Sequence, residues 1–321
     1  MTTPDLTAAV APIARGDRSD RDESLHHGIA VAVDADGRPV AAVGDPRVAV
    51  YPRSSLKPFQ AAAMCAAGLD LEPPLLALAC ASHDGSDEHV AGVRRILELH
   101  GLHESALRNT AARPFGAAAR TSARLRGIAP SPIQQNCSGK HAAMLATCRV
   151  NGWDIGSYLD RDHPLQRAIT DWIERHGCTV EHVGVDGCGA PTHYLHLDQL
   201  AAAIGRLAAS DSPVPRAMSA HPEMVAGPDR DVTRWMQAVD GLIAKDGALG
   251  VMVVARDDGR AAAFKIADGS DVARQAVTIE AVRQLGVDVE GLGDLAVPPA
   301  VLGHGRAVGA LRALNWGSCS S

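Results

Sequence analysis

The chain has 321 residues, of which 46% are hydrophobic but only 3% aromatic, and its formal net charge at pH 7 is −6. This length suffices for one large domain or two closely packed ones, with alanine, leucine and valine doing most of the packing. The acidic balance and the lack of a basic run argue against a nucleic-acid-binding surface, and no apolar run reaches the roughly 18 residues that span a bilayer.

Residues 1–23 are expected to form a loosely ordered N-terminal segment. The segment has a short apolar patch, but it carries Asp5 where a signal peptide would carry a basic residue. The seven cysteines are an odd number, spread along the chain without the spacing of a disulfide scaffold. These features predict a protein of the reduced cytoplasm.

Two β-hairpins are predicted, one toward each end of the chain. Residues 28–33 and 39–43 flank an Asp-Ala-Asp-Gly turn, and residues 250–255 and 261–267 flank Asp-Asp-Gly. Residues 308–314 predict a fifth strand. Between the hairpins the pattern favours helices, with a Pro- and Ser-rich loop at 210–215. The predicted helices span residues 55–67, 87–100, 139–151, 164–176, 197–209 and 215–220.

Hairpins from opposite ends of a chain can complete one antiparallel sheet with a helical middle packed against it. The predicted fold class is therefore α+β. We expect one catalytic unit at residues 24–315 and a tail at 316–321. Within the unit, residues 24–50 and 250–315 would supply the sheet, and residues 51–249 would form a helical or mixed middle region.

The spacing of Ser54 and Lys57 is the first candidate for chemistry. Only four of the 31 basic residues are lysines, so a lysine at this position indicates a role that arginine cannot fill. Pro58 fits the first turn of a helix, which would place Lys57 one turn after Ser54, near the positive end of the helix dipole. A neutral lysine can take a proton from a serine, whereas arginine stays protonated. The alternative is a capped helix with a solvated lysine.

Lys265 is the second candidate. In the predicted strand it lies on the face opposite Phe264 and Ile266, among alanines that leave it room to enter a cleft. The alternative is a lysine on a solvent-exposed face.

Three segments are dense in reactive side chains. They are ASHDGSDEHV from residue 81, QQNCSGKHAAM from residue 134 and VDGCGAPTH from residue 185. Cys137, Lys140, His141 and Cys188 are candidate zinc ligands, although the spacing equally allows buried, metal-free cysteines. The glycines around Asp186 indicate a tight backbone that could bring its carboxylate into a site.

Taken together, these segments resemble the asparaginase II family, the rhizobial-type L-asparaginases related in fold to serine β-lactamases and penicillin-binding proteins. The likeness runs from about Glu23 to Arg312. The matching segments are ESLHHG, GDPRVAVYPRSSLKPFQ, ACASHDG, EHV, NCSGKHAAML, DRDHPLQ, VDGCGAPTH, HPEMVAG, AKDGALGV, FKIADGS and GRAVGALR.

The resemblance implies a serine β-lactamase-like α+β fold, a homodimer and hydrolysis of L-asparagine to L-aspartate and ammonia. By the same resemblance, two Ser–Lys pairs carry the catalysis, one zinc ion (Zn2+) per chain assists substrate binding, and Asp186 lies between metal and nucleophile. The implied pairs are Ser54 with Lys57 and Ser82 with Lys265, and the implied zinc ligands are Cys137, Lys140 and Cys188.

Two further residues are expected at the substrate. Arg53 is a candidate partner for the α-carboxylate, with a structural ion pair as the alternative, and His83 is a candidate binding residue. The chain departs from the family pattern at residues 109–114, at Leu249 and at His304. Two rival functions are a penicillin-recognising hydrolase, which would need S-D-N and K-T-G tripeptides that the sequence lacks, and an inactive asparagine-binding protein.

Overall fold

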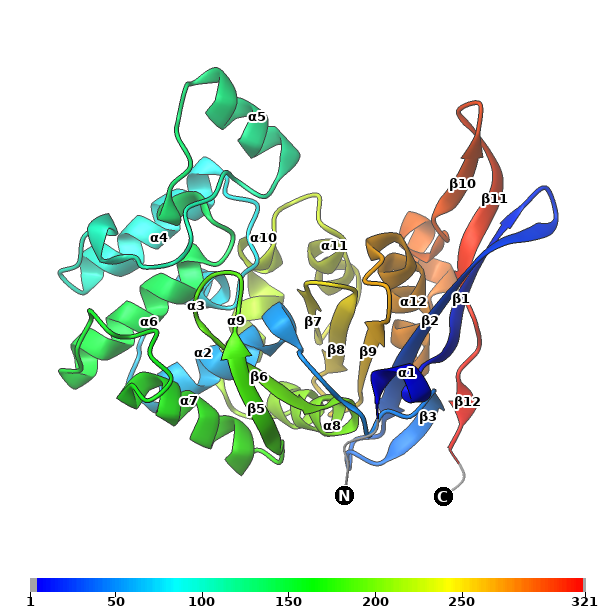
Figure 1. The fold of residues 1–321 in the computed structure, drawn as a ribbon, viewed down its shortest axis with the longest axis horizontal. Coiled ribbons are helices and arrows are strands. Elements are labelled where there is room, and N and C mark those ends of the chain that lie inside the picture. Colours follow the sequence, from blue (N-terminus) through cyan, green and yellow to red (C-terminus); the bar gives the residue numbers. More distant parts are fainter. Residues whose placement is uncertain (1–4, 320–321) are drawn as a thin grey trace.

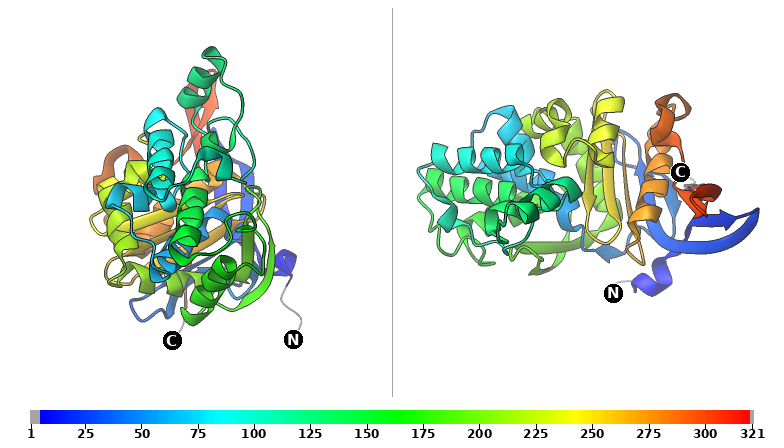
Figure 2. Two further views of the ribbon diagram at one scale, coloured as in Figure 1. Left: turned by 90° about the vertical axis from the view of Figure 1, so that its left-hand side faces the viewer. Right: turned by 90° about the horizontal axis from the view of Figure 1, so that it is seen from above.

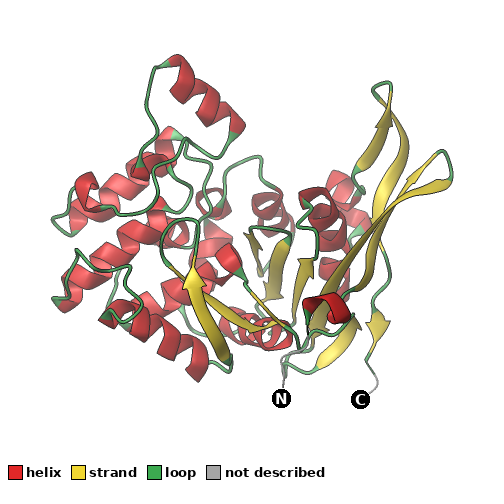
Figure 3. Ribbon diagram, in the orientation of Figure 1, coloured by secondary structure: helices red, strands yellow, loops and turns green. Residues whose placement is uncertain are grey.

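The structure, a computed structural model, describes residues 5–319. A curved antiparallel sheet lies on one side of the molecule and a group of helices on the other (Figure 1, Figure 3). The order of the main sheet is β10-β11-β1-β2-β9-β8-β7, and β3 pairs with β2 and β12; β4, β6 and β5 form a second, smaller sheet. The α+β class is confirmed.

The strands of the main sheet are β1 (Ala11–Arg18), β2 (Arg21–Val33), β3 (Pro39–Val43), β7 (Leu242–Gly247), β8 (Val251–Arg256), β9 (Ala261–Ile266), β10 (Ala300–Gly303), β11 (Arg306–Ala313) and β12 (Gly317–Ser318). The small sheet contains β4 (Ala49–Val50), β5 (Val180–Val185) and β6 (Pro191–His196).

The helices are α1 (Leu6–Ala9), α2 (Lys57–Ala66), α3 (Pro73–Ala79), α4 (Asp87–Leu99), α5 (Ala117–Leu125), α6 (Ser138–Asn151), α7 (Pro164–Arg175), α8 (Leu197–Ala208), α9 (Pro213–Ala220), α10 (Pro222–Val225), α11 (Asp231–Ala238) and α12 (Asp271–Gln284). Short 3-10 turns are η1 (Arg53–Leu56), η2 (Glu104–Ala106), η3 (Pro132–Gln134) and η4 (Glu290–Ala296). No helix within residues 5–319 combines the length and apolarity that crossing a bilayer requires.

Both predicted hairpins and the fifth strand form, and they meet in one sheet. β2 pairs with β3, β8 pairs with β9, and β2 lies beside β9 with Ile29 opposite Lys265. Residues 28–33 and the whole of β9 are buried, and both α8 and α12 pack against these strands. These central strands therefore lack the alternation of exposed and buried residues that a half-solvated strand would show.

Two terminal predictions need correction. Residues 11–18, predicted as part of a loosely ordered segment, form β1, which joins β2 through a turn where Ser19 and Asp20 have positive φ values of 46° and 63°. The far ends of β1 and β2 project from the body as an arm (Figure 2). A Ser-Asp turn and an arm exposed on both faces leave no hairpin signal in the sequence. Residues 317–318 of the predicted tail form β12, whereas residues 1–4 and 320–321 lie outside the described range.

The contact between β7 and η1 brings the sheet to the helical region. Gly247, at the end of β7, lies so close to η1 that a Cβ atom there would overlap the carbonyl oxygen of Pro52. Only a glycine allows this approach of two backbones. The strand carrying Lys245 is thereby placed beside the turn that carries Ser54.

We expect Gly247→Ala to destabilise the protein by about 1–3 kcal/mol, because the new methyl group must push β7 and η1 apart. The measurement is the free energy of unfolding from urea titration. Gly291→Ala is the control, since the nearest atom to a Cβ at that position, Asp288 Oδ2, is 3.9 Å away. Equal stability of the two variants would contradict the tight contact.

Candidate active site

Ser82 lies between two buried lysines. Lys57, at the start of α2, directs its Nζ at Ser82 Oγ (3.1 Å), at Cys137 Sγ (3.2 Å) and at the carbonyl oxygen of Ala81. Lys245, on β7, places its Nζ 3.0 Å from the same Ser82 Oγ. The hydroxyl of Ser82 therefore connects a helix lysine with a strand lysine.

The strand lysine is not the predicted one. Lys265 Nζ donates to the carbonyl oxygens of Leu249 (2.8 Å) and Ile266 instead of reaching Ser82. The reason is strand order, because β9 is an inner strand whereas β7 is the strand next to η1. Sequence reasoning missed Lys245, although a signal existed: Lys245 is followed by Asp246 and Gly247, a K-x-G spacing related to K-T-G.

Ser54 lies near Ser82 in the wall of one cavity of about 470 Å³. It is half-buried and sits within η1, because the 3-10 turn extends the helical region back to Arg53. The Lys57 N–H donates to the Ser54 carbonyl oxygen, so the two residues are one turn apart as expected, but within residues 5–319 no hydrogen bond joins the Ser54 hydroxyl to Lys57 Nζ.

The charges around Lys245 adjust its ionisation. Burial lowers the pKa of Lys245 to about 8; the carboxylate of Asp246, 2.5 Å away, opposes this shift, and the positive charges of Lys57 and Arg230 add to it. Burial favours the neutral acid of Asp246, but the charges of Lys245, Arg230 and Arg274 hold its pKa well below the usual range. Near neutral pH, Lys245 is therefore close to losing its proton while Asp246 stays ionised.

Arg230 ties this network to the wall of the cavity. Its guanidinium pairs with Asp84 at 3.1 Å and with Asp246 at 2.7 Å, and it lies 4.8 Å from the ring centre of Phe115. The two ion pairs and the contact with Phe115 hold the guanidinium group in place, so the acid beside Lys245 has a defined position.

The three predicted metal ligands also lie together. Cys137 and Cys188 pack in one buried cluster, and Lys140 Nζ is 3.4 Å from Cys188 Sγ. A hydrogen bond from the Cys137 thiol and the charge of Lys140 lower the pKa of Cys188 to about 5, although burial opposes the shift. No group of three or more His, Cys, Asp or Glu side chains placed to hold a metal occurs in residues 5–319. Sulfur is a donor that zinc takes, so the adjacent Cys137 and Cys188 fit this ion, with Cys188 already disposed to the thiolate form. The hydrogen bond with Cys188 and burial raise the pKa of Cys137 to about 12, so binding of the metal would have to displace its proton.

Asp186 and Arg53 form an ion pair next to that cluster. Arg53 Nε and Nη2 lie 2.8 and 2.7 Å from Asp186 Oδ1. Burial raises the pKa of Asp186, but Lys140 and Arg53 lower it by more, so the carboxyl is ionised. The structure thus shows Arg53 in a structural ion pair, which was the alternative to its binding the α-carboxylate of the substrate. Arg53 also has a positive φ of 56°, a strained backbone in a residue beside the candidate nucleophile.

His83 is not part of the cavity wall. It is buried, its Nε2 lies 2.8 Å from Ser138 Oγ, and its ring stacks on His89 at 5.1 Å. Burial, together with the charges of His89 and Lys57, holds the pKa of His83 well below its usual value. His83, predicted to bind substrate, is therefore a neutral buried residue held by Ser138 and His89.

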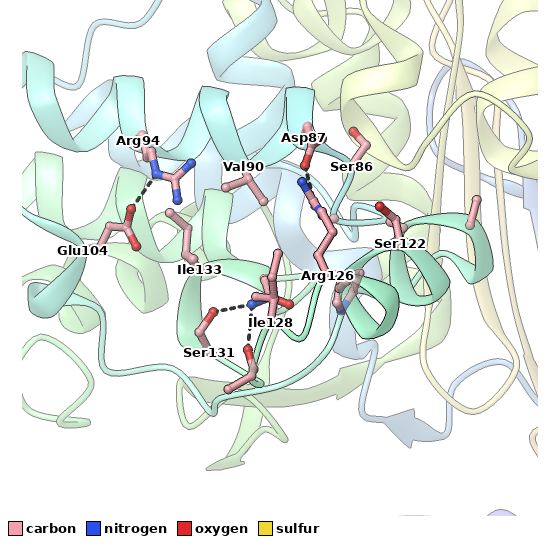
Figure 4. Close-up of a pocket in the computed structure, with 17 residues that line it drawn as sticks. Ser86, Asp87, Val90, Arg94, Glu104, Ser122, Arg126, Ile128, Ser131 and Ile133 are labelled. Carbon is pink, nitrogen blue, oxygen red and sulfur yellow. Dashed lines mark hydrogen bonds and ion pairs between the residues drawn. The ribbon is translucent and has the colours of Figure 1, made fainter.

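Of the departures from the family pattern, Leu249 alone borders the cavity. Asn109 is buried and donates to the Pro132 carbonyl at 2.7 Å, and His304 lies in the turn between β10 and β11. A larger cavity, of about 640 Å³, lies between α4 and α5 (Figure 4). Its arginines are engaged in ion pairs, Arg94 with Glu104 and Arg126 with Asp87, and none of the candidate catalytic residues lines it.

Comparison with known proteins identifies the family to which the chain belongs. A search of curated proteins gives no match to the chain. The sequence pattern of the L-asparaginase II family matches residues 14–313, which cover the small sheet, the helical region and all of the main sheet except β12 and the start of β1. The chain therefore belongs to the L-asparaginase II family.

Proposed function

We propose that this protein hydrolyses L-asparagine to L-aspartate and ammonia through a serine nucleophile and an acyl-enzyme. Family membership supports the amidohydrolase activity. The observation that carries the mechanism is the Ser82 hydroxyl held 3.1 and 3.0 Å from the amines of two buried lysines, in the wall of a cavity that also contains Ser54.

Ser54 is the better candidate for the nucleophile. It is more exposed to the cavity than Ser82, and Lys57 lies one turn along the same helical segment. The Ser54 N–H donates to no acceptor in residues 5–319, whereas the Ser82 N–H donates to Val225 O. The free N–H at Ser54 can stabilise the oxyanion of a tetrahedral intermediate.

Ser82 is the better candidate for a proton relay. An ammonium group has no lone pair, so the Ser82 hydroxyl can pass its proton only to a neutral amine or to the leaving nitrogen. With Lys57 on one side and Lys245 on the other, Ser82 can hand a proton from one to the other. In this role Lys245 replaces Lys265.

The proposed steps conserve atoms and protons. Lys57 first becomes neutral by handing a proton through Ser82 to Lys245, and Ser54 Oγ then bonds to the side-chain amide carbon of the substrate as Lys57 takes the hydroxyl proton. That proton passes through Ser82 to the amide nitrogen, the C–N bond breaks and ammonia leaves. Water then attacks the ester, gives its proton back through the same lysines, and releases L-aspartate with Ser54 restored.

Cys137, Lys140 and Cys188 would hold a zinc ion, which supplies a positive charge for binding the amino-acid end of the substrate. Asp186 is ionised and lies next to this group, and it would bind the ammonium group of the substrate. Arg53 would hold the carboxylate of Asp186 in place. We further propose a homodimer that works in the cytoplasm, in line with the family relation and with seven free cysteines.

A relation to the serine β-lactamase fold is also supported by the order of the site residues. Ser54 and Lys57 lie at the start of a helix, Ser82 lies on a loop, and Lys245 lies on the edge strand β7. The direct test of function is ammonia release from L-asparagine, L-glutamine and D-asparagine, with mass spectrometry of the quenched enzyme to locate an aspartyl ester. An ester on Ser82 instead of Ser54 would exchange the two serine roles, and turnover of a chromogenic β-lactam without ammonia release would favour the penicillin-recognising alternative.

A set of lysine-to-arginine variants separates bases from simple donors. Lys57→Arg and Lys245→Arg should each lower kcat by about 100-fold or more, because arginine keeps the charge but cannot accept a proton. Lys265→Arg should retain more activity, since arginine can still donate to the Leu249 carbonyl. Rates would be measured on variants whose Tm is checked first. A larger loss of kcat in Lys265→Arg than in Lys245→Arg would restore Lys265 to the catalytic pair.

The pH profile should report the relay. Because Ser82 can donate only to a neutral amine, kcat/KM for L-asparagine should rise with pH through an apparent pKa near 8, the value that burial imposes on Lys245. Because the two lysines are coupled, the apparent pKa of this rise in kcat/KM belongs to the pair and not to either lysine alone. Steady-state rates from pH 5 to 9, with chemistry shown to limit the rate, provide the check; a flat profile would exclude a lysine relay.

Zinc content tests the Cys–Lys–Cys group. The purified protein should bind up to one zinc per chain, measured by metal analysis after dialysis, and Cys188→Ser should lose it. Cys178→Ser is a matched control, because Cys178 and Cys188 are both only 2% exposed. Chelation should raise KM more than it lowers kcat. Zinc retention by Cys188→Ser would remove Cys188 from the ligand set.

A further inference from the structure

Ser82 and Lys245, the two ends of the proton relay, lie on segments of the chain that no backbone hydrogen bond joins. Ser82 follows α3, whereas Lys245 lies on β7, the edge strand of the main sheet. The backbone N–H groups of Ser82 and Asp84 donate to residues 225 and 226, and within residues 5–319 no backbone hydrogen bond connects this segment to β7. The 3.0 Å contact between Lys245 Nζ and Ser82 Oγ therefore needs another group that holds the two segments at the right separation.

Arg230 bridges these two segments. It lies at the start of α11, which packs against β7. Its Nη1 is 3.1 Å from Oδ1 of Asp84, the second residue after the relay serine. Its Nη2 is 2.7 Å from Oδ2 of Asp246, the residue next to the strand lysine. The guanidinium is planar and its donors point in fixed directions, so it sets the distance between the two carboxylates.

The side chain of Asp84 is held tightly by two loops. A Cβ atom on Gly227, which has a positive φ of 147°, would overlap Asp84 Oδ2. A Cβ atom on Gly116 would lie only 2.7 Å from Asp84 Cβ, and the Gly116 N–H donates to the Asp84 carbonyl oxygen at 2.9 Å. Only glycines allow the two loops to close around this side chain. Asp84 therefore gives Arg230 a fixed attachment point on the Ser82 segment.

The bridge lies where ion pairs contribute little to stability. The side chains of Arg230, Asp84 and Asp246 are only 19%, 17% and 13% exposed. Charges taken out of water in this way are often no more stabilising than apolar residues of the same size. Arg230 also lies in the wall of the cavity that contains Ser54 and Ser82. A costly group that connects the two relay segments at this cavity indicates a function in turnover.

We propose that Arg230 is a positioning residue, which holds the Ser82 segment and the Lys245 strand at the separation that proton transfer requires. The proposal rests on the proposed function, because the relay between these two residues is part of it. Within residues 5–319, Arg230 forms no hydrogen bond with Ser82 or Lys245 themselves. It therefore acts through the two carboxylates and not by touching the reacting atoms.

The experiment measures kcat and KM for L-asparagine on full-length variants whose Tm is checked first. Arg230→Ala should lower kcat by about 100-fold with KM little changed, because a small misplacement of reacting groups costs that much. Arg230→Lys should remain roughly tenfold or more below the wild type, since one ammonium cannot hold both carboxylates as a planar fork does. Arg283→Ala is the matched control: Arg283 also bridges two carboxylates, Glu280 and Glu290, but outside the cavity wall, and its loss should leave kcat unchanged.

Added guanidinium ion gives a second readout. Because Arg230 lines the cavity, Arg230→Ala leaves a space that opens into it. Guanidinium below the denaturing range should pair with the two carboxylates there and raise kcat of this variant several-fold, without raising that of the wild type. Asp84→Asn breaks one ion pair only and should lower kcat by about tenfold, and the double variant should be no slower than Arg230→Ala alone. If Arg230→Ala fails to fold, Asp84→Asn decides the question.

The outcomes separate this proposal from the proposed function. Ammonia release by the wild type together with an unchanged kcat in Arg230→Ala or Asp84→Asn would overturn the positioning role and leave the asparaginase function intact. Full activity of Arg230→Lys would show that charge alone suffices and would equally overturn it. A raised KM with unchanged kcat would make Arg230 a substrate-binding residue instead. No ammonia from the wild type would overturn both proposals.

Discussion

The sharing of one serine hydroxyl by two buried lysines is the interaction on which the rest of the site depends. Taking two amines out of water beside each other is unfavourable unless counter-charge is supplied or one amine gives up its proton. The structure supplies both remedies: Asp246 lies against Lys245, and burial brings the pKa of Lys245 to about 8. The same arrangement that is costly for stability creates a group able to exchange protons near neutral pH.

The scaffold meets this demand with rigid elements. Lys57 is fixed on the first turn of α2 and Lys245 on β7, and the close approach of Gly247 to Pro52 joins the two elements. Arg230 links Asp246 to Asp84, the second residue after Ser82. Serine, lysines and counter-charge are thus held by one connected set of ion pairs and backbone contacts, which is how a preorganised site avoids rearrangement during reaction.

A second buried lysine shows how similar residues serve different ends. Lys265 also has a pKa lowered by burial, yet its ammonium is occupied by backbone carbonyls of the turn after β7 and of its own strand. It holds Leu249 at the rim of the cavity, whereas Lys245 lies against Ser82 in the cavity wall, 3.0 Å from its hydroxyl. A lowered pKa therefore identifies a buried lysine, but only its partners distinguish a proton acceptor from a structural donor.

The sequence by itself determined the local features. Each of these features depends on a few neighbouring residues. They are the turns of two hairpins, Pro58 in the first turn of a helix, the spacing of Ser54 and Lys57, and the cysteines of two glycine-rich segments. Tertiary structure decided which lysine meets Ser82, because Lys245 and Lys265 both lie in short apolar strands and only the strand order places β7 beside η1. It also decided that Arg53 pairs with Asp186 and that His83 faces inward, since such contacts join residues far apart in the chain and depend on side-chain direction, which no local pattern records.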